Sequence, residues 1–161
     1  MIGHVQSRKA QLVSQNFAVL HSLDSLKLAK RLDRFSADQG KVLPVLLECN
    51  VSGEESKHGW AAWDETTWSA PLPDLLEISR LPHLEVRGVM TMAPYGDDPE
   101  YSRSYFQRLR RLAEFLQTQL PAVSFFELSM GMSGDYRVAI AEGATILRIG
   151  TAIMGVRPCA I

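Results

Sequence analysis

Residues 125–155 read FFELSMGMSGDYRVAIAEGATILRIGTAIMG, and this stretch decides the fold of the chain. Its pattern predicts a strand, a Gly/Ser turn, a short helix that ends at Gly143, a second strand and a Gly150-Thr151 turn. Two successive strand ends that open on small residues offer free backbone N–H groups and a hydroxyl, which suit a phosphate. In a (β/α)₈ barrel the phosphate site commonly follows the last two strands.

Ser133 and Gly134 follow the first of these strands, and Arg148 lies inside the second. An arginine in an otherwise apolar strand needs an acceptor for its guanidinium if it is buried. The plain alternative is that Ser133 or Asp135 caps a helix and that Arg148 extends to the surface. The local sequence leaves both interpretations open.

Helix-like and strand-like segments alternate along the whole chain. We expect strands at 18–22, 42–50, 84–92, 124–130 and 146–150, with a strand remnant at 1–4. We expect helices at 7–15, 25–38, 71–80, 101–120 and 135–142. The near-continuous apolar run at 42–50 is typical of a strand covered on both faces. The alternation predicts a parallel sheet with helical crossovers.

Six strands could also form an open doubly wound sheet. No G-x-G-x-x-G follows an early strand, so dinucleotide binding has little support. A complete (β/α)₈ barrel usually needs roughly 250 residues, and 161 residues are too few to close one. We therefore expect an incomplete barrel with helices outside. The least regular segment, 60–73, contains three tryptophans and is expected to be a surface loop.

Composition and charge exclude several functional classes. The chain suits a single domain over residues 1–161, and its net charge of −1 gives no field to attract nucleic acid or an anionic membrane. No stretch is apolar enough to span a bilayer and no signal peptide is evident, so we expect a cytoplasmic protein. The arginines at 108, 110 and 111 are expected on a solvated helix face. Metal-ligand spacing is missing among Cys49, Cys159, His4, His21, His58 and His83.

Five motifs in order carry a resemblance to a known family. They are IGHVQSRK at 2–9, NVSGEESKHG at 50–59, GVMTMAP at 88–94, SMGMSGD at 129–135 and RIGT at 148–151. Together they closely resemble the pyridoxal phosphate homeostasis protein family, a single-domain barrel similar to the N-terminal domain of alanine racemase. The resemblance covers essentially the whole chain. It implies a protein that binds pyridoxal 5′-phosphate (PLP) and takes part in vitamin B6 balance as a carrier or regulator without established turnover.

The resemblance also implies roles for individual residues. Ser133, Gly134 and the Gly150-Thr151 turn would hold the cofactor's phosphate. Arg148 would face the ring nitrogen, where a permanently charged guanidinium keeps that nitrogen unprotonated and weakens the ring as an electron sink. Strand alternation places Ile146, Arg148 and Gly150 on one face. Two further residues are assigned near the site. Met90 would lie at a strand end beside the ring, with core packing as the alternative, and His4 is the second.

The chain departs from the family at its beginning. The family anchors PLP through a lysine on the first barrel strand, and a Gly-Glu-Asn motif follows the second strand; the resemblance implies that the first two βα units are missing here. Lys57 lies at the functional end, but its neighbours Glu54 and Glu55 favour the charged form that a Schiff-base lysine must lose. Either the cellular protein is longer, or a truncated product exists whose open edges would cause dimerisation or aggregation.

Three functions compete on this basis. The first is a PLP carrier, monomeric when complete, with PLP-dependent apo-enzymes as recipients. The second is a PLP-dependent amino-acid racemase-type enzyme, which would need the anchoring lysine and a general acid/base. Tyrosines are available for that role, but none lies in a motif that marks it as a base. The third is a phosphate-binding barrel enzyme unrelated to PLP, which the absence of paired carboxylates disfavours.

Overall fold

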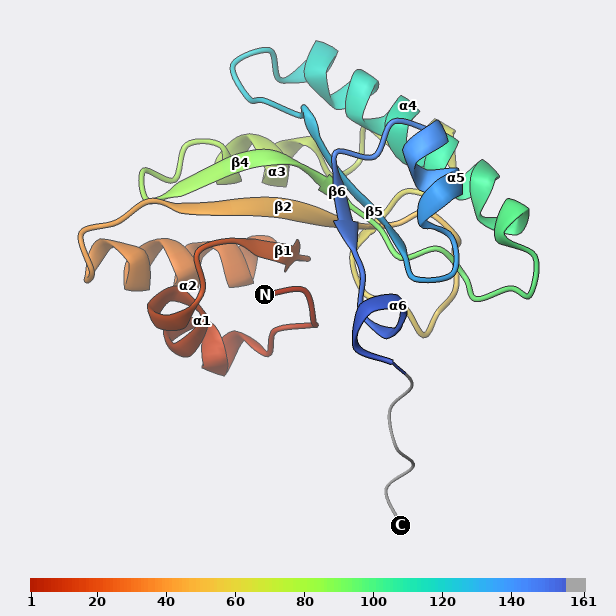
Figure 1. Ribbon diagram of the computed structural model, residues 1–161. Coiled ribbons are helices and arrows are strands. Elements are labelled where there is room, and N and C mark those ends of the chain that lie inside the picture. Colours follow the sequence, from red (N-terminus) through yellow and green to blue (C-terminus); the bar gives the residue numbers. More distant parts are fainter. Residues whose placement is uncertain (156–161) are drawn as a thin grey trace.

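The computed structural model describes residues 1–155, and their strands form one curved sheet in which every pairing is parallel (Figure 1). The order along the sheet is β1 (Leu20–Leu23), β2 (Leu43–Asn50), β4 (Leu84–Met90), β5 (Glu127–Met132) and β6 (Ile146–Arg148), while β3 (Trp60–Ala61) pairs with the end of β2. The helices are α1 (Ala10–Asn16), α2 (Leu26–Ala37), α3 (Leu72–Ile78), α4 (Arg103–Gln119), α5 (Tyr136–Ala141) and α6 (Thr151–Met154). Short 3₁₀ turns lie at η1 (Ser7–Lys9), η2 (Glu65–Thr67) and η3 (Pro99–Ser102).

One side-chain contact shows how strongly the sheet curves. His21 on β1 lies 2.9 Å from Ser129 on β5, measured from Nδ1 to Oγ. Two strands separate β1 from β5 in the sheet order, so a flat sheet would hold them roughly 14 Å apart at 4.7–4.9 Å per strand. The contact requires the sheet to bend toward its inner face. The expected incomplete barrel of parallel strands with outer helices is therefore confirmed.

The outer face of the sheet packs against amphipathic helices. In α2 the side chains of Leu28, Ala29 and Leu32 are fully buried, as the apolar spacing predicts. Ser25 caps this helix, because its hydroxyl accepts a hydrogen bond from the Leu28 backbone N–H at 3.4 Å. Figure 1 shows the helices outside the curve of the sheet, so the inner face is left for function.

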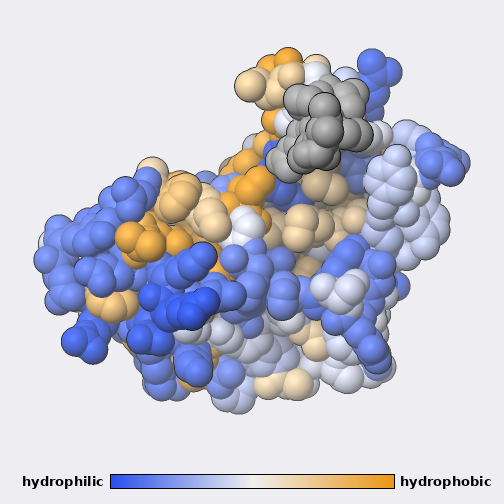
Figure 2. All heavy atoms as spheres, turned by 90° about the horizontal axis from the view of Figure 1, so that it is seen from below, coloured by the Kyte–Doolittle hydropathy of each residue, from blue (hydrophilic) through white to orange (hydrophobic). Residues whose placement is uncertain are grey.

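The view from below, the side on which α6 and the N-terminus lie in Figure 1, shows a band of apolar side chains between polar flanks (Figure 2). Contiguous apolar surface of this kind marks a contact surface or a ligand groove in soluble proteins. No helix among the described residues is long and apolar enough to cross a membrane.

The first residues differ from the expected strand remnant. Residues 1–4 form no strand, although Met1 continues the ladder of β1: its amine donates to the Val19 carbonyl at 2.7 Å and its carbonyl accepts from the His21 N–H at 2.8 Å. The pairing covers a single residue, which is too short for a strand. The strand expected at 124–130 begins later, at Glu127, and Phe126 is 77% exposed.

The expectation of a surface loop at 60–73 is wrong for two of its tryptophans. Trp60 belongs to β3 and its indole N–H donates to the Leu23 carbonyl at 3.2 Å. Trp68 is buried, and its ring lies 5.7 Å from that of Phe115 on α4. The Trp68 ring therefore packs against α4 and the Trp60 indole bonds to the end of β1, while Trp63 stays 47% exposed.

The arginine cluster on α4 is only partly solvated. Arg110 and Arg111 are exposed, as expected. Arg108 instead donates from Nη1 to the Val51 carbonyl at 2.7 Å, and its Nε is buried without a hydrogen-bond partner among the described residues. Arg108 therefore fastens α4 to the loop after β2. Cys49 is buried, which raises the pKa of its thiol, and Cys159 lies outside the described residues.

Gly88 allows β4 and β5 to approach, and replacing it should destabilise the sheet. A Cβ at this position would lie 1.9 Å from the Glu127 backbone carbonyl oxygen, which cannot move without breaking the strand pairing. Gly88→Ala should lower the free energy of unfolding by about 1–3 kcal/mol or more. The measurement is urea denaturation followed by circular dichroism.

Gly3→Ala is the matched control, because its Cβ would have only the Met1 side chain at 3.7 Å nearby. An unfolding midpoint for Gly88→Ala equal to that of Gly3→Ala would contradict the close approach of β4 and β5.

Candidate functional site

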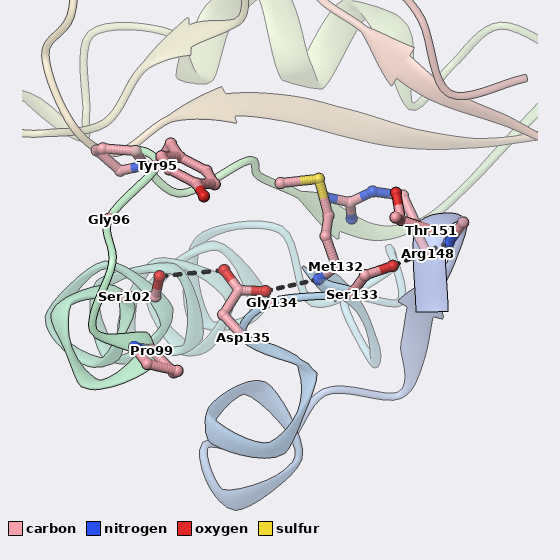
Figure 3. A pocket seen from close by; sticks show the side chains of 12 residues that line it. Tyr95, Gly96, Pro99, Ser102, Met132, Ser133, Gly134, Asp135, Arg148 and Thr151 are labelled. Atoms are coloured by element: carbon pink, nitrogen blue, oxygen red, sulfur yellow. Dashed lines mark hydrogen bonds between the residues drawn. The ribbon is translucent and has the colours of Figure 1, made fainter. Parts of the chain in front are cut away.

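A cavity of about 310 Å³ lies at the carboxyl ends of β5 and β6 (Figure 3). Five of the residues predicted from the sequence line it together: Ser133, Gly134, Arg148, Gly150 and Thr151. The parallel strands bring the two turns together, since carboxyl ends of adjacent parallel strands meet at the same edge of the sheet. The segment after β4 adds Pro94, Tyr95 and Gly96 to the cavity wall, and η3 adds Pro99 and Ser102. Met132 at the end of β5 and Asp135 before α5 complete it.

Ser133 holds the two turns together. Its Oγ accepts hydrogen bonds from the backbone N–H groups of Gly150 at 3.2 Å and Ala152 at 3.1 Å. Two amides from the second turn thus converge on one oxygen atom that belongs to the first turn. Ser133 is not a helix cap, because α5 has no side-chain capping bond at its first turn.

Asp135 organises the wall of the cavity, a role that the sequence analysis missed. Its Oδ1 accepts from the Met132 N–H at 2.7 Å and its Oδ2 accepts from the Ser102 hydroxyl at 3.0 Å. Figure 3 shows these bonds linking η3 to the turn after β5. The available signal was weak, because aspartate side chains in turns usually accept from N–H groups that follow them, and Met132 precedes Asp135 by three residues.

Arg148 points inward rather than to the surface. Its Nη1 donates to the Ser129 hydroxyl at 2.9 Å, and its Nη2 donates to the Thr91 carbonyl at 2.7 Å. Within residues 1–155 it forms no ion pair with a carboxylate. Burial lowers the pKa of its guanidinium, and the charges of Asp135 and Glu48 oppose that shift. A half-buried cation held only by neutral acceptors remains available to an anion or an acceptor atom of a ligand.

Glu48 adds a second unusual group to the inner face. It is buried on β2, and its Oε2 has no hydrogen-bond partner among the described residues. Burial and the nearby Asp24 carboxylate raise the pKa of Glu48, while His58 and Arg148 act in the opposite direction. The inner face therefore combines Arg148 with a buried carboxyl group whose pKa is raised.

Met90 and His4 lie apart from the cavity. Met90 is fully buried and pairs in register with Ser129, so it packs the inner face without lining the cavity wall. Met92, beyond the strand, is 37% exposed. His4 lies in a separate, open pocket with Asp24 and His58, where its Nδ1 is 2.9 Å from the Asp24 carboxylate.

The His4 pocket brings together three residues that sequence spacing did not connect. Their ligand atoms lie within 4.8 Å of one another. However, the imidazole rings of His4 and His58 are stacked, with centroids 3.8 Å apart and planes 15° apart. A metal ion lies near the plane of each imidazole that binds it, at about 2.0–2.1 Å. Nearly parallel stacked rings cannot both point at one ion, so the arrangement is not a preformed metal centre.

Among residues 1–155, no lysine lines the cavity. Lys57, the lysine nearest to the functional end, donates to the Met92 carbonyl at 3.0 Å and pairs with the Glu54 carboxylate at 2.6 Å. Its observed role is to fasten the loop after β2 to the end of β4.

Comparisons with known proteins agree with this geometry. Residues 1–158 match the family model described as alanine racemase, N-terminal domain. A pyridoxal phosphate homeostasis protein of Vibrio alginolyticus is 42% identical over 157 residues, which cover 97% of this chain and 64% of that protein. A protein of the same name from Synechocystis is 39% identical over 156 residues, which cover 97% of this chain and 68% of the relative.

Solved structures show the same fold. PipY of Synechococcus elongatus, solved with PLP bound, has a TM-score of 0.81 and 38% identity, with 95% of this chain and 68% of that chain covered. An alanine racemase of Clostridium difficile has a TM-score of 0.66 at 16% identity, which shows the fold alone; 97% of this chain and 38% of that chain are covered. The present chain spans less than two thirds of the Vibrio relative's length. It belongs to the alanine racemase N-terminal domain family and, within that family, to the pyridoxal phosphate homeostasis proteins.

Proposed function

We propose that this chain binds PLP in the cavity after β5 and β6 and serves PLP homeostasis as a carrier or regulator. The observation that carries the proposal is the convergence of the Gly150 and Ala152 N–H groups on Ser133 Oγ, beside a guanidinium with no carboxylate partner. Backbone amides, a hydroxyl and a nearby cation form the donor set that a phosphate ester requires. The PLP bound to PipY supports the same ligand for this chain.

Within this proposal the phosphate lies at Ser133, Gly134, Gly150 and Thr151, and Arg148 faces the ring. PLP supplies an electrophilic aldehyde and an electron-withdrawing ring when it is bound. Arg148 favours an unprotonated ring nitrogen, since a guanidinium stays protonated and offers only donors. That reduces the electron-withdrawing power of the ring and suits storage better than turnover. The proposal gives His4 and Met90 no direct contact with the cofactor, because neither lines the cavity.

The racemase-type alternative is disfavoured by the same residues. It requires a lysine at the cofactor and a general acid/base on the opposite ring face, and no lysine in the described part of the chain lines the cavity. Tyr95 is the tyrosine in the cavity wall, but its side chain is 93% exposed at the rim. We propose further that PLP-dependent apo-enzymes receive the cofactor.

Removal of the Ser133 hydroxyl should weaken PLP binding through the phosphate. A hydrogen bond to a charged group contributes about 1.5–3 kcal/mol, so Ser133→Ala should reduce the affinity roughly 10- to 150-fold. Calorimetric titration with PLP and with inorganic phosphate measures this, and both affinities should fall. Ser69→Ala, at an exposed serine between η2 and α3, is the matched control. Equal affinities in the two variants would remove Ser133 from the phosphate site.

Removal of the Arg148 guanidinium should affect the ring more than the phosphate. Arg148→Leu should lower PLP affinity by about tenfold or more, while inorganic phosphate binding changes less. Arg137→Leu is the control, because Arg137 is exposed on α5 and donates to the Tyr136 hydroxyl at 3.3 Å, away from the cavity wall. A parallel loss of both ligands in Arg148→Leu would place the guanidinium at the phosphate instead of the ring.

Binding by this chain should not be covalent. Because Lys57 is held by Glu54 and the Met92 carbonyl, borohydride reduction of the PLP-loaded protein should not label one lysine stoichiometrically. Mass spectrometry of the peptides checks this, and Lys57→Ala should retain PLP affinity. Stoichiometric labelling at Lys57 would reverse the assignment of its role.

A further inference from the structure

The contacts of Arg148 extend beyond its own two acceptors. Ser129 Oγ, which accepts from Arg148 Nη1 at 2.9 Å, also lies 2.9 Å from His21 Nδ1. Ser129 is fully buried on β5, and His21 lies on β1, 108 residues away along the chain. A chain of three side chains therefore crosses the inner face from β6 to β1, at the two ends of the strand order.

The direction of the hydrogen bonds follows from counting donors and acceptors. Arg148 only donates, so Ser129 Oγ accepts from it and has one hydrogen left. Among the described contacts, the acceptor for that hydrogen is His21 Nδ1. The imidazole can accept because burial, followed by the charges of the Met1 amine and Arg148, lowers the pKa of His21 to about 4. With this low pKa the ring is neutral at physiological pH, and we assign its hydrogen to Nε2, which leaves Nδ1 as the acceptor.

We propose that Ser129 and His21 are positioning residues that aim the Arg148 guanidinium at the ring side of the bound cofactor, and that they thereby select ligands with an acceptor nitrogen in the ring. The proposal rests on the proposed function. Ser129 donates to a neutral imidazole, which polarises its oxygen and strengthens its bond to Arg148. With Thr91 carbonyl on Nη2, the guanidinium is fixed at both terminal nitrogens, in one orientation on the inner face.

Without Ser129, only the Thr91 carbonyl would hold Arg148, and the guanidinium could rotate about that one contact. The guanidinium charge would remain near the phosphate, but the group would no longer be held in its orientation toward the ring. The two effects can be separated with a pair of ligands that share a phosphate and differ at the ring. Pyridoxine 5′-phosphate carries the ring nitrogen and lacks the aldehyde, so it cannot react with lysines. Benzyl phosphate has an aromatic ring without that nitrogen.

The experiment is calorimetric titration of both ligands against the wild-type chain and four variants, with circular dichroism to verify folding. The wild type should prefer pyridoxine 5′-phosphate. Ser129→Ala and His21→Leu should each lose about tenfold of that preference, with benzyl phosphate affinity within about twofold of wild type. His21→Asn should restore the preference, because the Oδ1 atom of asparagine can accept the Ser129 hydrogen bond in place of Nδ1.

Ser22→Ala is the control for a merely structural loss. Ser22 lies next to His21 on β1 and donates to the Gly3 carbonyl at 2.7 Å, so this variant loses a hydrogen bond of the same strand without touching Arg148. It should keep the wild-type preference. If neither ligand binds the wild type, the proposed function fails and this inference fails with it. If the wild type shows the preference and Ser129→Ala keeps it, the positioning role alone is overturned.

Discussion

The Arg148 guanidinium is the constraint on which the inner face of the sheet depends. A cation removed from water has to be satisfied on several sides, and the loss of a partner from such a group is costly. Here the acceptors are a hydroxyl on β5 and a carbonyl after β4, with an imidazole on β1 behind the hydroxyl. These groups converge only if the sheet bends. The curvature of the sheet and the burial of the Arg148 guanidinium therefore depend on each other.

Much of the fold can be predicted from the sequence because its determinants are local. The apolar run of β2, the Ser25 cap of α2 and the left-handed Gly143, at φ +93°, depend on residues a few positions apart. The segment 60–73 was misjudged because its order comes from distant partners. Trp68 packs on Phe115, and its polar and small neighbours in the sequence give no sign of that contact.

The candidate site divides in the same way. That Ser133, Gly150 and Thr151 lie together could be predicted because they belong to the turns after β5 and β6, and strand ends of a parallel sheet meet at one edge. Ser129 and His21 could not be assigned, since a serine within a strand and a lone histidine give no pattern until the sheet brings them together. His4 was expected near the cavity because it ends the strand expected at 1–4, but it lies with Asp24 in another pocket.

The hydroxyl of Ser133 also fixes the use of its own hydrogen. Its oxygen accepts from the Gly150 and Ala152 amides, and these two bonds use both acceptor positions of a serine hydroxyl. Toward any third group this hydroxyl can therefore only donate. A group that only accepts, such as a phosphate oxygen, can take that hydrogen, whereas an ammonium group cannot. The serine thus sets the sign of the charge that the turn after β5 accepts.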